Sequence, residues 1–391
     1  MHLQEVISQK DKKLFLELPK RLYRDDPNWV CPLDIEIESI FNPATNTKFR
    51  NGEAVRWLLY DKKNVVGRIA VFIDRDALDH HKVPTGGCGF FECVENKSAA
   101  FMLFDAAKKW LKEKGMEAMI GPVNFGENFH HWGLLTEGFA RQAYYLPYNF
   151  PYYQHFFEDY GFKDYFKQFA YLKKLSDGFP ERALKFAEFT ESRPGYSFEH
   201  FSYKRIDEFV DYFVDVYNTI WEAYYENYSP LLKEDIKTLL INSKAVLDEE
   251  MIWFAFDKSK PVGFLIVMPD INQVLIKLKN GKLNLINKLK FAYYKRHSIT
   301  RCRAFVAGIY PEYRNTGIIS ALFYQLIKIL KDKPRQEEIE LSWVGDYNPK
   351  MIGIYDKMGG KQINTHITYM HLFDPTVPFE RFNNEFDNKK Y

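Results

Sequence analysis

The sequence reads Ala304-Phe305-Val306-Ala307-Gly308-Ile309-Tyr310-Pro311-Glu312-Tyr313-Arg314-Asn315-Thr316-Gly317 at the point that says most about its architecture. The apolar run 304–310 predicts a buried strand, and Pro311 ends that strand because it has no N–H to donate to a ladder. Beyond Gly317, apolar residues recur at helical spacing and predict an amphipathic helix; they are Ile319, Leu322, Phe323, Leu326, Ile327 and Leu330.

A strand, a tight loop and a helix in this order can bind an anion. The loop aims several unpaired N–H groups and the positive end of the helix dipole at one point in space. Gly317 lets the backbone approach an anion closely, and Arg314 can add a charge-assisted hydrogen bond. The pattern predicts a phosphate site, although Arg-x-x-Gly by itself also occurs where an ordinary polar helix begins.

The stretch 309–318 resembles the pyrophosphate-binding motif of the GNAT superfamily of acyl-CoA N-acyltransferases. In that motif a strand ending in hydrophobic-x-Pro-x-x-Arg/Gln leads into x-x-Gly-x-Gly/Ala. Ile319 stands where the motif has a small residue, which would set the first helical turn slightly further from the ligand. The resemblance implies acetyl-CoA or another acyl-CoA as cosubstrate and no metal, with the coenzyme held by Ile309, Tyr310, Arg314, Asn315, Thr316, Gly317 and Ile318.

A second segment follows at the distance that the resemblance requires. Residues 339–344 predict the next strand, and Asn348-Pro349 opens a short helix that ends near Gly359-Gly360. In GNAT enzymes an Asn at the start of this helix contacts the coenzyme, and a Tyr within it often protonates the departing thiolate. Asn348 and Tyr355 match those positions, although Tyr355 also fits a half-buried core tyrosine.

The resemblance also implies the reaction. A neutral amine attacks the thioester carbonyl directly, and a backbone N–H near Ile309 stabilises the oxyanion. The acceptor amine must first lose a proton, for which Glu312 and Asp346 are the candidate bases. Direct transfer requires no nucleophilic side chain, in keeping with a sequence that has no persuasive Ser-His or Cys-His constellation.

Composition limits the other possibilities. A chain of 391 residues suits two domains, and 46% hydrophobic with 27% charged residues is typical of a soluble globular protein. The net charge of +2 gives no overall field that favours nucleic acid. The first residues lack a signal region, no apolar run is long enough to span a bilayer, and the four cysteines lack metal-ligand spacing. We therefore expect a cytoplasmic protein without integral membrane association.

Both halves of the sequence carry the same series of elements. In the C-terminal half we expect a strand at 196–201, helices at 206–228 and 233–242, a hairpin at 251–256 and 262–268, and a terminal pair of strands around 362–373. In the N-terminal half we expect a hairpin at 55–60 and 65–73, a strand at 89–93, a helix at 98–114, a strand at 118–122, a helix at 153–162 and a closing strand at 169–175.

The expected fold class is α/β (α+β), with two tandem GNAT folds whose mixed, mostly antiparallel sheets are flanked by helices. The expected domains are 1–178 and 179–391, similar to bacterial tandem acyltransferase-fold proteins of unassigned substrate. At the loop position the N-terminal half has Glu95 and no glycine, so only the C-terminal half should bind acyl-CoA. The N-terminal half would then shape the acceptor cleft or support the fold, and its loop 124–133 is rich in functional side chains.

Three other features allow more than one interpretation. His80-His81 and His130-His131 favour exposed or hydrogen-bonding histidines over metal ligands, because neighbours on an extended chain point to opposite sides. The aromatic stretch 144–171 fits core and interdomain packing, or a groove for an acyl chain or aromatic acceptor. Residues 277–303 carry nine Lys or Arg and no acid, so they could attract the CoA 3′-phosphate, guide an anionic acceptor, rest on an acidic membrane or form a solvated basic face.

The sequence thus predicts an N-acyltransferase that moves an acetyl or other acyl group from acyl-CoA to a small-molecule or peptide amine. A homodimer is possible, and no nucleic-acid partner is expected. Two alternatives stay open: a non-catalytic acyl-CoA-binding or scaffold protein, and an aminoacyl-tRNA-dependent peptidyltransferase-like enzyme. The second would require tRNA binding with a steep salt dependence.

Overall fold

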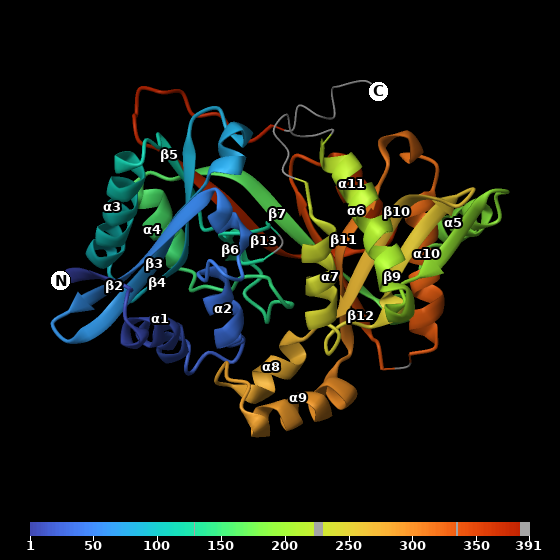
Figure 1. Cartoon of the computed structure of the whole chain (residues 1–391), viewed down its shortest axis with the longest axis horizontal. Coiled ribbons are helices and arrows are strands. Elements are labelled where there is room, and N and C mark those ends of the chain that lie inside the picture. Colours follow the sequence, from blue (N-terminus) through green and yellow to red (C-terminus); the bar gives the residue numbers. More distant parts are fainter. Residues whose placement is uncertain (129, 223–229, 334, 384–391) are drawn as a thin grey trace.

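The computed structural model describes residues 1–128, 130–222, 230–333 and 335–383. In this part of the chain, 13 strands form one sheet in the order β1-β2-β3-β4-β5-β13-β7-β12-β11-β10-β9-β8, with β6 paired to β13 (Figure 1). The strands are β1 His2–Glu5, β2 Gly52–Asp61, β3 Asn64–Asp74, β4 Thr85–Cys93, β5 Ala118–Gly121, β6 Leu134–Glu137, β7 Lys163–Lys174, β8 Tyr196–His200, β9 Ile252–Asp257, β10 Lys260–Pro269, β11 Arg301–Ile309, β12 Glu338–Gly345 and β13 Lys361–Leu372.

Helices flank the sheet in both halves of the molecule (Figure 1). They are α1 Gln9–Leu22, α2 Asp34–Ile40, α3 Lys97–Glu113, α4 Tyr153–Tyr160, α5 Glu181–Glu191, α6 Ile206–Glu222, α7 Lys233–Asn242, α8 Asn272–Leu278, α9 Leu285–Ser298, α10 Ile318–Lys331 and α11 Pro349–Lys357. None of the helices in the described ranges combines the length and the apolarity needed to cross a membrane.

Most of the predicted elements form, and one prediction about the C-terminal half needs correction. The strand, loop and helix around Gly317 are present as β11 and α10, and the predicted hairpin is β9–β10. The expected terminal pair of strands is wrong, because 361–372 is one continuous strand, β13. The helix expected at 206–228 is present as α6 over Ile206–Glu222, and the rest of the expected range lies outside the described part.

The two halves exchange their closing strands. β7 follows the N-terminal elements in sequence but pairs with β12, while β13 follows the C-terminal elements but pairs with β5. Tyr171 of β7 accordingly packs in the hydrophobic core of the C-terminal half, and Ile367 and Tyr369 of β13 pack in that of the N-terminal half. β7 and β13 also pair with each other and join the two halves into one sheet.

This exchange affects how the chain can be divided. A cut at residue 178 would separate β7 from β12 and leave an unpaired strand edge on each piece. The division into 1–178 and 179–391 therefore stays a prediction about sequence organisation, whereas the folded unit contains both halves.

Candidate functional site

The two central strands of the C-terminal half separate partway along their length. β11 and β12 are parallel partners only from Arg301 opposite Glu338 to Ala304 opposite Leu341. β11 then continues to Ile309 with β10 on its other side, so its edge toward β12 is open from residue 305 onward. We call this opening the C-terminal wedge.

One amide of the wedge has a defined direction. The N–H of Tyr310 donates to the carbonyl of Val262 at 2.9 Å, toward β10. Successive amides of a strand point to opposite edges, so the N–H of Ile309 faces the wedge. A donor at this position can stabilise an oxyanion that develops inside the wedge.

The loop beyond the wedge has the backbone geometry of a tight turn. Asn315 and Gly317 have φ angles of 67° and 95°, and Gly317 caps α10 without any side-chain hydrogen bond. In the N-terminal half, Asn96 caps the equivalent helix α3 and its Oδ1 accepts the N–H of Ala99 at 3.0 Å. Side chains thus leave the first amides of α10 uncapped, while Asn96 occupies those of α3.

We expected Gly317 to leave room for an anion, but side chains of α5 occupy the space where its Cβ would lie. A Cβ at Gly317 would lie 2.3 Å from Thr190 Oγ1 and 2.9 Å from the ring of Phe186, both on α5. Arg193 reinforces this contact, because its Nη1 donates to the carbonyl of Thr316 at 3.4 Å. The glycine therefore serves the close packing of α5, a helix that the sequence pattern did not reveal, as well as the turn itself.

The other predicted coenzyme residues lie around this loop. Tyr310 is buried and its hydroxyl donates to Asp215 of α6 at 2.7 Å, and Ile318 is buried. Thr316 Oγ1 donates to the carbonyl of Tyr313 at 2.6 Å, while Asn315 is exposed. Arg314 is partly exposed at the end of the Pro311–Tyr313 turn.

Asn348 and Tyr355 are placed by α11, which begins directly after β12. Asn348 caps the helix, its Oδ1 accepting the N–H of Met351 at 3.1 Å. Tyr355 is only 4% exposed and packs edge-on against Tyr171 of β7, with 5.4 Å between ring centroids. Burial raises the pKa of Tyr355, so its hydroxyl keeps its proton in this structure. Its catalytic role stays a prediction.

The two candidate bases differ in their surroundings. Asp346 accepts hydrogen bonds from the amide of Lys167 at 3.1 Å and from Arg381 at 2.6 Å, so both of its oxygens are engaged. Glu312 is exposed, and its carboxylate lies 3.9 Å from Lys260. Their roles as bases stay predictions.

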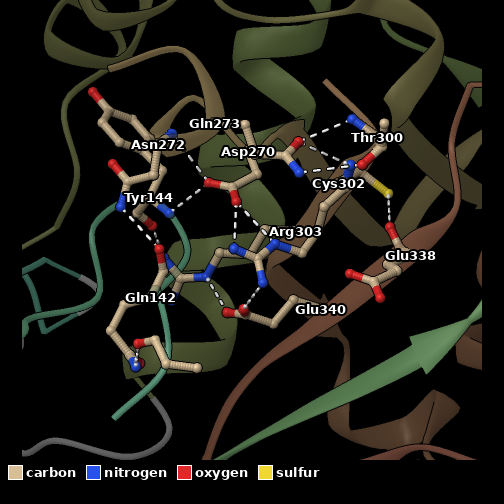
Figure 2. A network of polar contacts seen from close by, with 12 residues as sticks. Gln142, Tyr144, Asp270, Asn272, Gln273, Thr300, Cys302, Arg303, Glu338 and Glu340 are labelled. Carbon is tan, nitrogen blue, oxygen red and sulfur yellow. Dashed lines mark hydrogen bonds and ion pairs between the residues drawn. The ribbon is translucent and has the colours of Figure 1, made fainter. Parts of the chain in front are cut away.

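A buried ionic network lies where the wedge begins (Figure 2). Arg303 and Glu340 are opposite each other on β11 and β12, with 3.5 Å between Nε and Oε1 and exposures of 0% and 1%. Arg301 binds Asp270 at 2.7 Å, and Asp270 also accepts the amide of Tyr144 at 2.9 Å. Arg303 in turn donates to the Tyr144 carbonyl, so the network ties the N-terminal half to the base of the wedge.

The N-terminal half has a wedge of its own. β4 and β5 pair only from Thr85 opposite Ala118 to Gly87 opposite Ile120, and β4 continues to Cys93. A cavity of about 130 Å³ is lined by the open part of β4 and by side chains from β3, α2 and the loops, including Glu36, Arg68, Glu92, His131, Tyr144 and Tyr145. We call it the acceptor-side cavity.

Charged groups in this cavity are partly satisfied by the protein. Glu92 accepts hydrogen bonds from Tyr23 and Tyr153, both at 2.9 Å, and lies 3.6 Å from Arg68. The buried Nε of Arg68 makes no hydrogen bond within the described residues. Burial raises the pKa of Glu36, and burial lowers the pKa of His131 to about 4, which keeps its imidazole neutral at pH 7.

Sequence reasoning did not find this cavity as a unit. The loop 124–133 was the one signal, and we expected its histidines to be exposed or hydrogen-bonded. His130 is partly buried with its ring 4.0 Å from that of Tyr145, and His131 lines the cavity. His81 contacts the Tyr165 hydroxyl at 3.2 Å, and the side chain of His80 is outside the described part. Among described residues, no group of three His, Cys, Asp or Glu is placed to hold a metal.

Comparisons with known proteins bear on the family and the fold. Residues 213–360 match the Acetyltransferase (GNAT) family. The chain is 26% identical over 371 residues to Protein YghO of Escherichia coli K12, covering 93% of both, and 26% identical over 364 residues to the Bacterial ceramide synthase of Caulobacter vibrioides, covering 91% and 94%. A solved tandem GNAT protein from the clavulanic acid biosynthesis pathway covers 96% of this chain and 99% of its own, with a TM-score of 0.56 and 11% identity, which shows a shared fold.

Proposed function

We propose that this chain is a tandem GNAT enzyme that transfers an acyl group from acyl-CoA to an amine, because residues 213–360 match the GNAT family and the chain shares its fold with a tandem GNAT protein. The observation that carries the proposal is the C-terminal wedge together with the uncapped start of α10. An opening between parallel strands suits an extended thioester arm, and free amides at a helix N-terminus suit its diphosphate.

The chemistry follows from the wedge. The amine nitrogen attacks the thioester carbonyl carbon, and the N–H of Ile309 donates to the oxyanion. The C–S bond then breaks, the CoA thiolate takes up a proton and an amide is released. Tyr355 is the candidate proton donor, and Glu312 or Asp346 the candidate acceptor of the amine proton.

We assign the amine end of the acceptor to the acceptor-side cavity. Tyr145 lines this cavity, and its ring centroid lies 6.0 Å from that of Phe305 on the open part of β11, so the cavity lies beside this part of the strand. Glu36 can pair with an ammonium group there, and aromatic faces favour the same cation. A cavity of about 130 Å³ accommodates a polar head of about the size of benzene, so a longer acceptor must extend out of it.

The similarity to a ceramide synthase narrows the substrates to test first. Ceramide formation joins a fatty acyl group to the amine of a long-chain amino alcohol, so long acyl-CoAs and amphipathic amino alcohols head the list. We expect a rise of a few degrees in Tm with saturating acyl-CoA, and thiol release that depends on added amine. The measurements are thermal melting and a thiol assay over a panel of acyl-CoAs and amines.

The outcomes of this experiment separate the alternatives. Melting shifts without thiol release for any amine would favour a non-catalytic acyl-CoA-binding protein. Salt-sensitive tRNA binding without a response to CoA would favour a peptidyltransferase-like enzyme. No response to any acyl-CoA at concentrations well above micromolar would contradict the proposed function.

Glu36→Gln tests the acceptor assignment. The variant keeps an oxygen for the Tyr144 hydroxyl but loses the charge, so the KM for the amine should rise about tenfold while the melting shift with acyl-CoA stays. Glu113→Gln, at an exposed site on α3, is the control and should leave the KM unchanged. An unchanged KM in Glu36→Gln would contradict the assignment of the amine to this cavity, and the assignment of the acyl-CoA site would stand.

A further inference from the structure

Helix α9 presents an apolar face to solvent. Leu285, Ile286, Leu289 and Tyr293 are 75%, 65%, 66% and 60% exposed. Their spacing places all four on one side of the helix. Helix α9 lies with α8 at the lower edge of the molecule in Figure 1.

The opposite side of α9 fixes this orientation. Phe291 and Tyr294 pack against a buried cluster that includes Leu275 and Leu278 of α8. Asn287 is buried, and its Nδ2 donates to the Asn280 side chain at 2.9 Å and to the Lys282 carbonyl at 2.7 Å. The helix thus has a buried inner face and an apolar outer face, and rotation about its axis would break these contacts.

Cations surround the apolar stripe. Six exposed cations lie on or next to α9: Lys277, Lys279, Lys282, Lys288, Lys290 and Arg296. The segment 277–303 contains no acid, and within the described residues none of these six cations forms an ion pair. Lys288 and Lys290 lie to either side of the stripe, where they can reach phosphates above an apolar layer.

We propose that α9 docks this protein onto an anionic phospholipid membrane. The four apolar side chains would enter the boundary between headgroups and acyl chains, and the surrounding lysines would bind lipid phosphates. Charge selects this occupant over a second copy of the chain, because pairing two such faces would bring two sets of unpaired cations together. The proposal stands independently of acyl transfer.

Vesicle binding tests the docking surface. The full chain should co-sediment with phosphatidylcholine vesicles that contain phosphatidylglycerol, bind pure phosphatidylcholine far more weakly, and dissociate as salt is added. Leu289→Cys allows a polarity-sensitive dye to be attached, because all four native cysteines are buried. The dye emission should shift to the blue when anionic vesicles are added.

Matched variants distinguish binding through α9 from nonspecific adsorption to vesicles. A triple variant should weaken vesicle binding at least about tenfold, because apolar area is lost; it combines Leu285→Ser, Leu289→Ser and Tyr293→Ser. Leu239→Ser with Ile241→Ser, at sites on α7 that are 56% and 53% exposed, should leave binding unchanged. The double variant Lys288→Gln/Lys290→Gln should weaken vesicle binding about 25-fold. The control variant Lys62→Gln/Lys63→Gln, on the β2–β3 turn, should bind vesicles like the parent chain.

Three results would overturn the proposal. The first is no binding to anionic vesicles at low salt. The second is binding that the α9 variants leave unchanged while their melting temperatures confirm that they fold. The third is self-association by light scattering that the serine variants abolish, which would make the stripe an interface between two copies.

Discussion

Gly317→Ala is expected to lower kcat/KM about 100-fold and to remove most of the melting shift that acyl-CoA produces. Gly317 has a φ of 95°, a conformation that costs an L-residue about 1–2 kcal/mol. The new Cβ would also meet Thr190 Oγ1 at 2.3 Å and Phe186 at 2.9 Å, so the turn or α5 must move. A displacement of about 1 Å at a binding loop is enough for a rate loss on the order of 100-fold.

Gly115→Ala is the matched control for backbone strain. Gly115 has a φ of 82° with nothing within 4 Å of the added Cβ, and it lies beyond the end of α3. This variant should lose a similar amount of backbone stability and keep its activity. Thermal melting and steady-state kinetics on both variants separate strain from loss of the site.

A second variant keeps the assignment falsifiable. Arg314→Ala leaves the turn intact and removes the cation, so binding of acyl-CoA should weaken about tenfold. Full acyl-CoA affinity in both Gly317→Ala and Arg314→Ala would show that the diphosphate binds elsewhere, whatever happens to stability.

Arg303→Met should destabilise the protein by about 3–5 kcal/mol. Arg303 is fully buried and pairs with Glu340, whose remaining cationic partner among the described residues would be Arg301, at 3.9 Å. Burial already raises the pKa of Glu340 to about 7 against the pull of the two arginines, so the loss of Arg303 leaves a carboxylate poorly compensated. The hydrogen bond to the Tyr144 carbonyl is lost as well.

The double variant Arg303→Met with Glu340→Leu should recover much of this loss. Replacing both charges removes the uncompensated carboxylate, while the Arg301–Asp270 pair at 2.7 Å remains. Urea unfolding measures both variants, and Arg75→Met, which breaks an exposed pair with Glu53, should have little effect. A single variant as stable as the parent chain would contradict the view that this network holds the base of the wedge.

The local elements of the C-terminal half could be predicted from the sequence. The apolar run before Pro311, the helical spacing after Gly317 and the alternation at 339–344 each depend on neighbours a few residues apart, and β11, α10 and β12 formed as predicted. The same holds for the unpaired amides expected at the start of α10, whereas the Asn96 cap of α3 was not predicted. Periodicity and capping are short-range properties, so a single sequence carries them.

Contacts between distant segments were not readable, because a strand pattern does not name its partner. β7 and β13 looked like closing strands of their own halves, yet each pairs across to the other half, and only the folded sheet shows this. The packing of Phe186 and Thr190 on Gly317, the burial of Arg303 against Glu340, and the meeting of Glu36 with Tyr144 join residues that are far apart in the chain. The sequence by itself thus determines where the helices and strands form, because that depends on residues close together in the chain. Which strands pair across the sheet is decided by the tertiary structure, because pairing depends on how the assembled cores bury apolar surface.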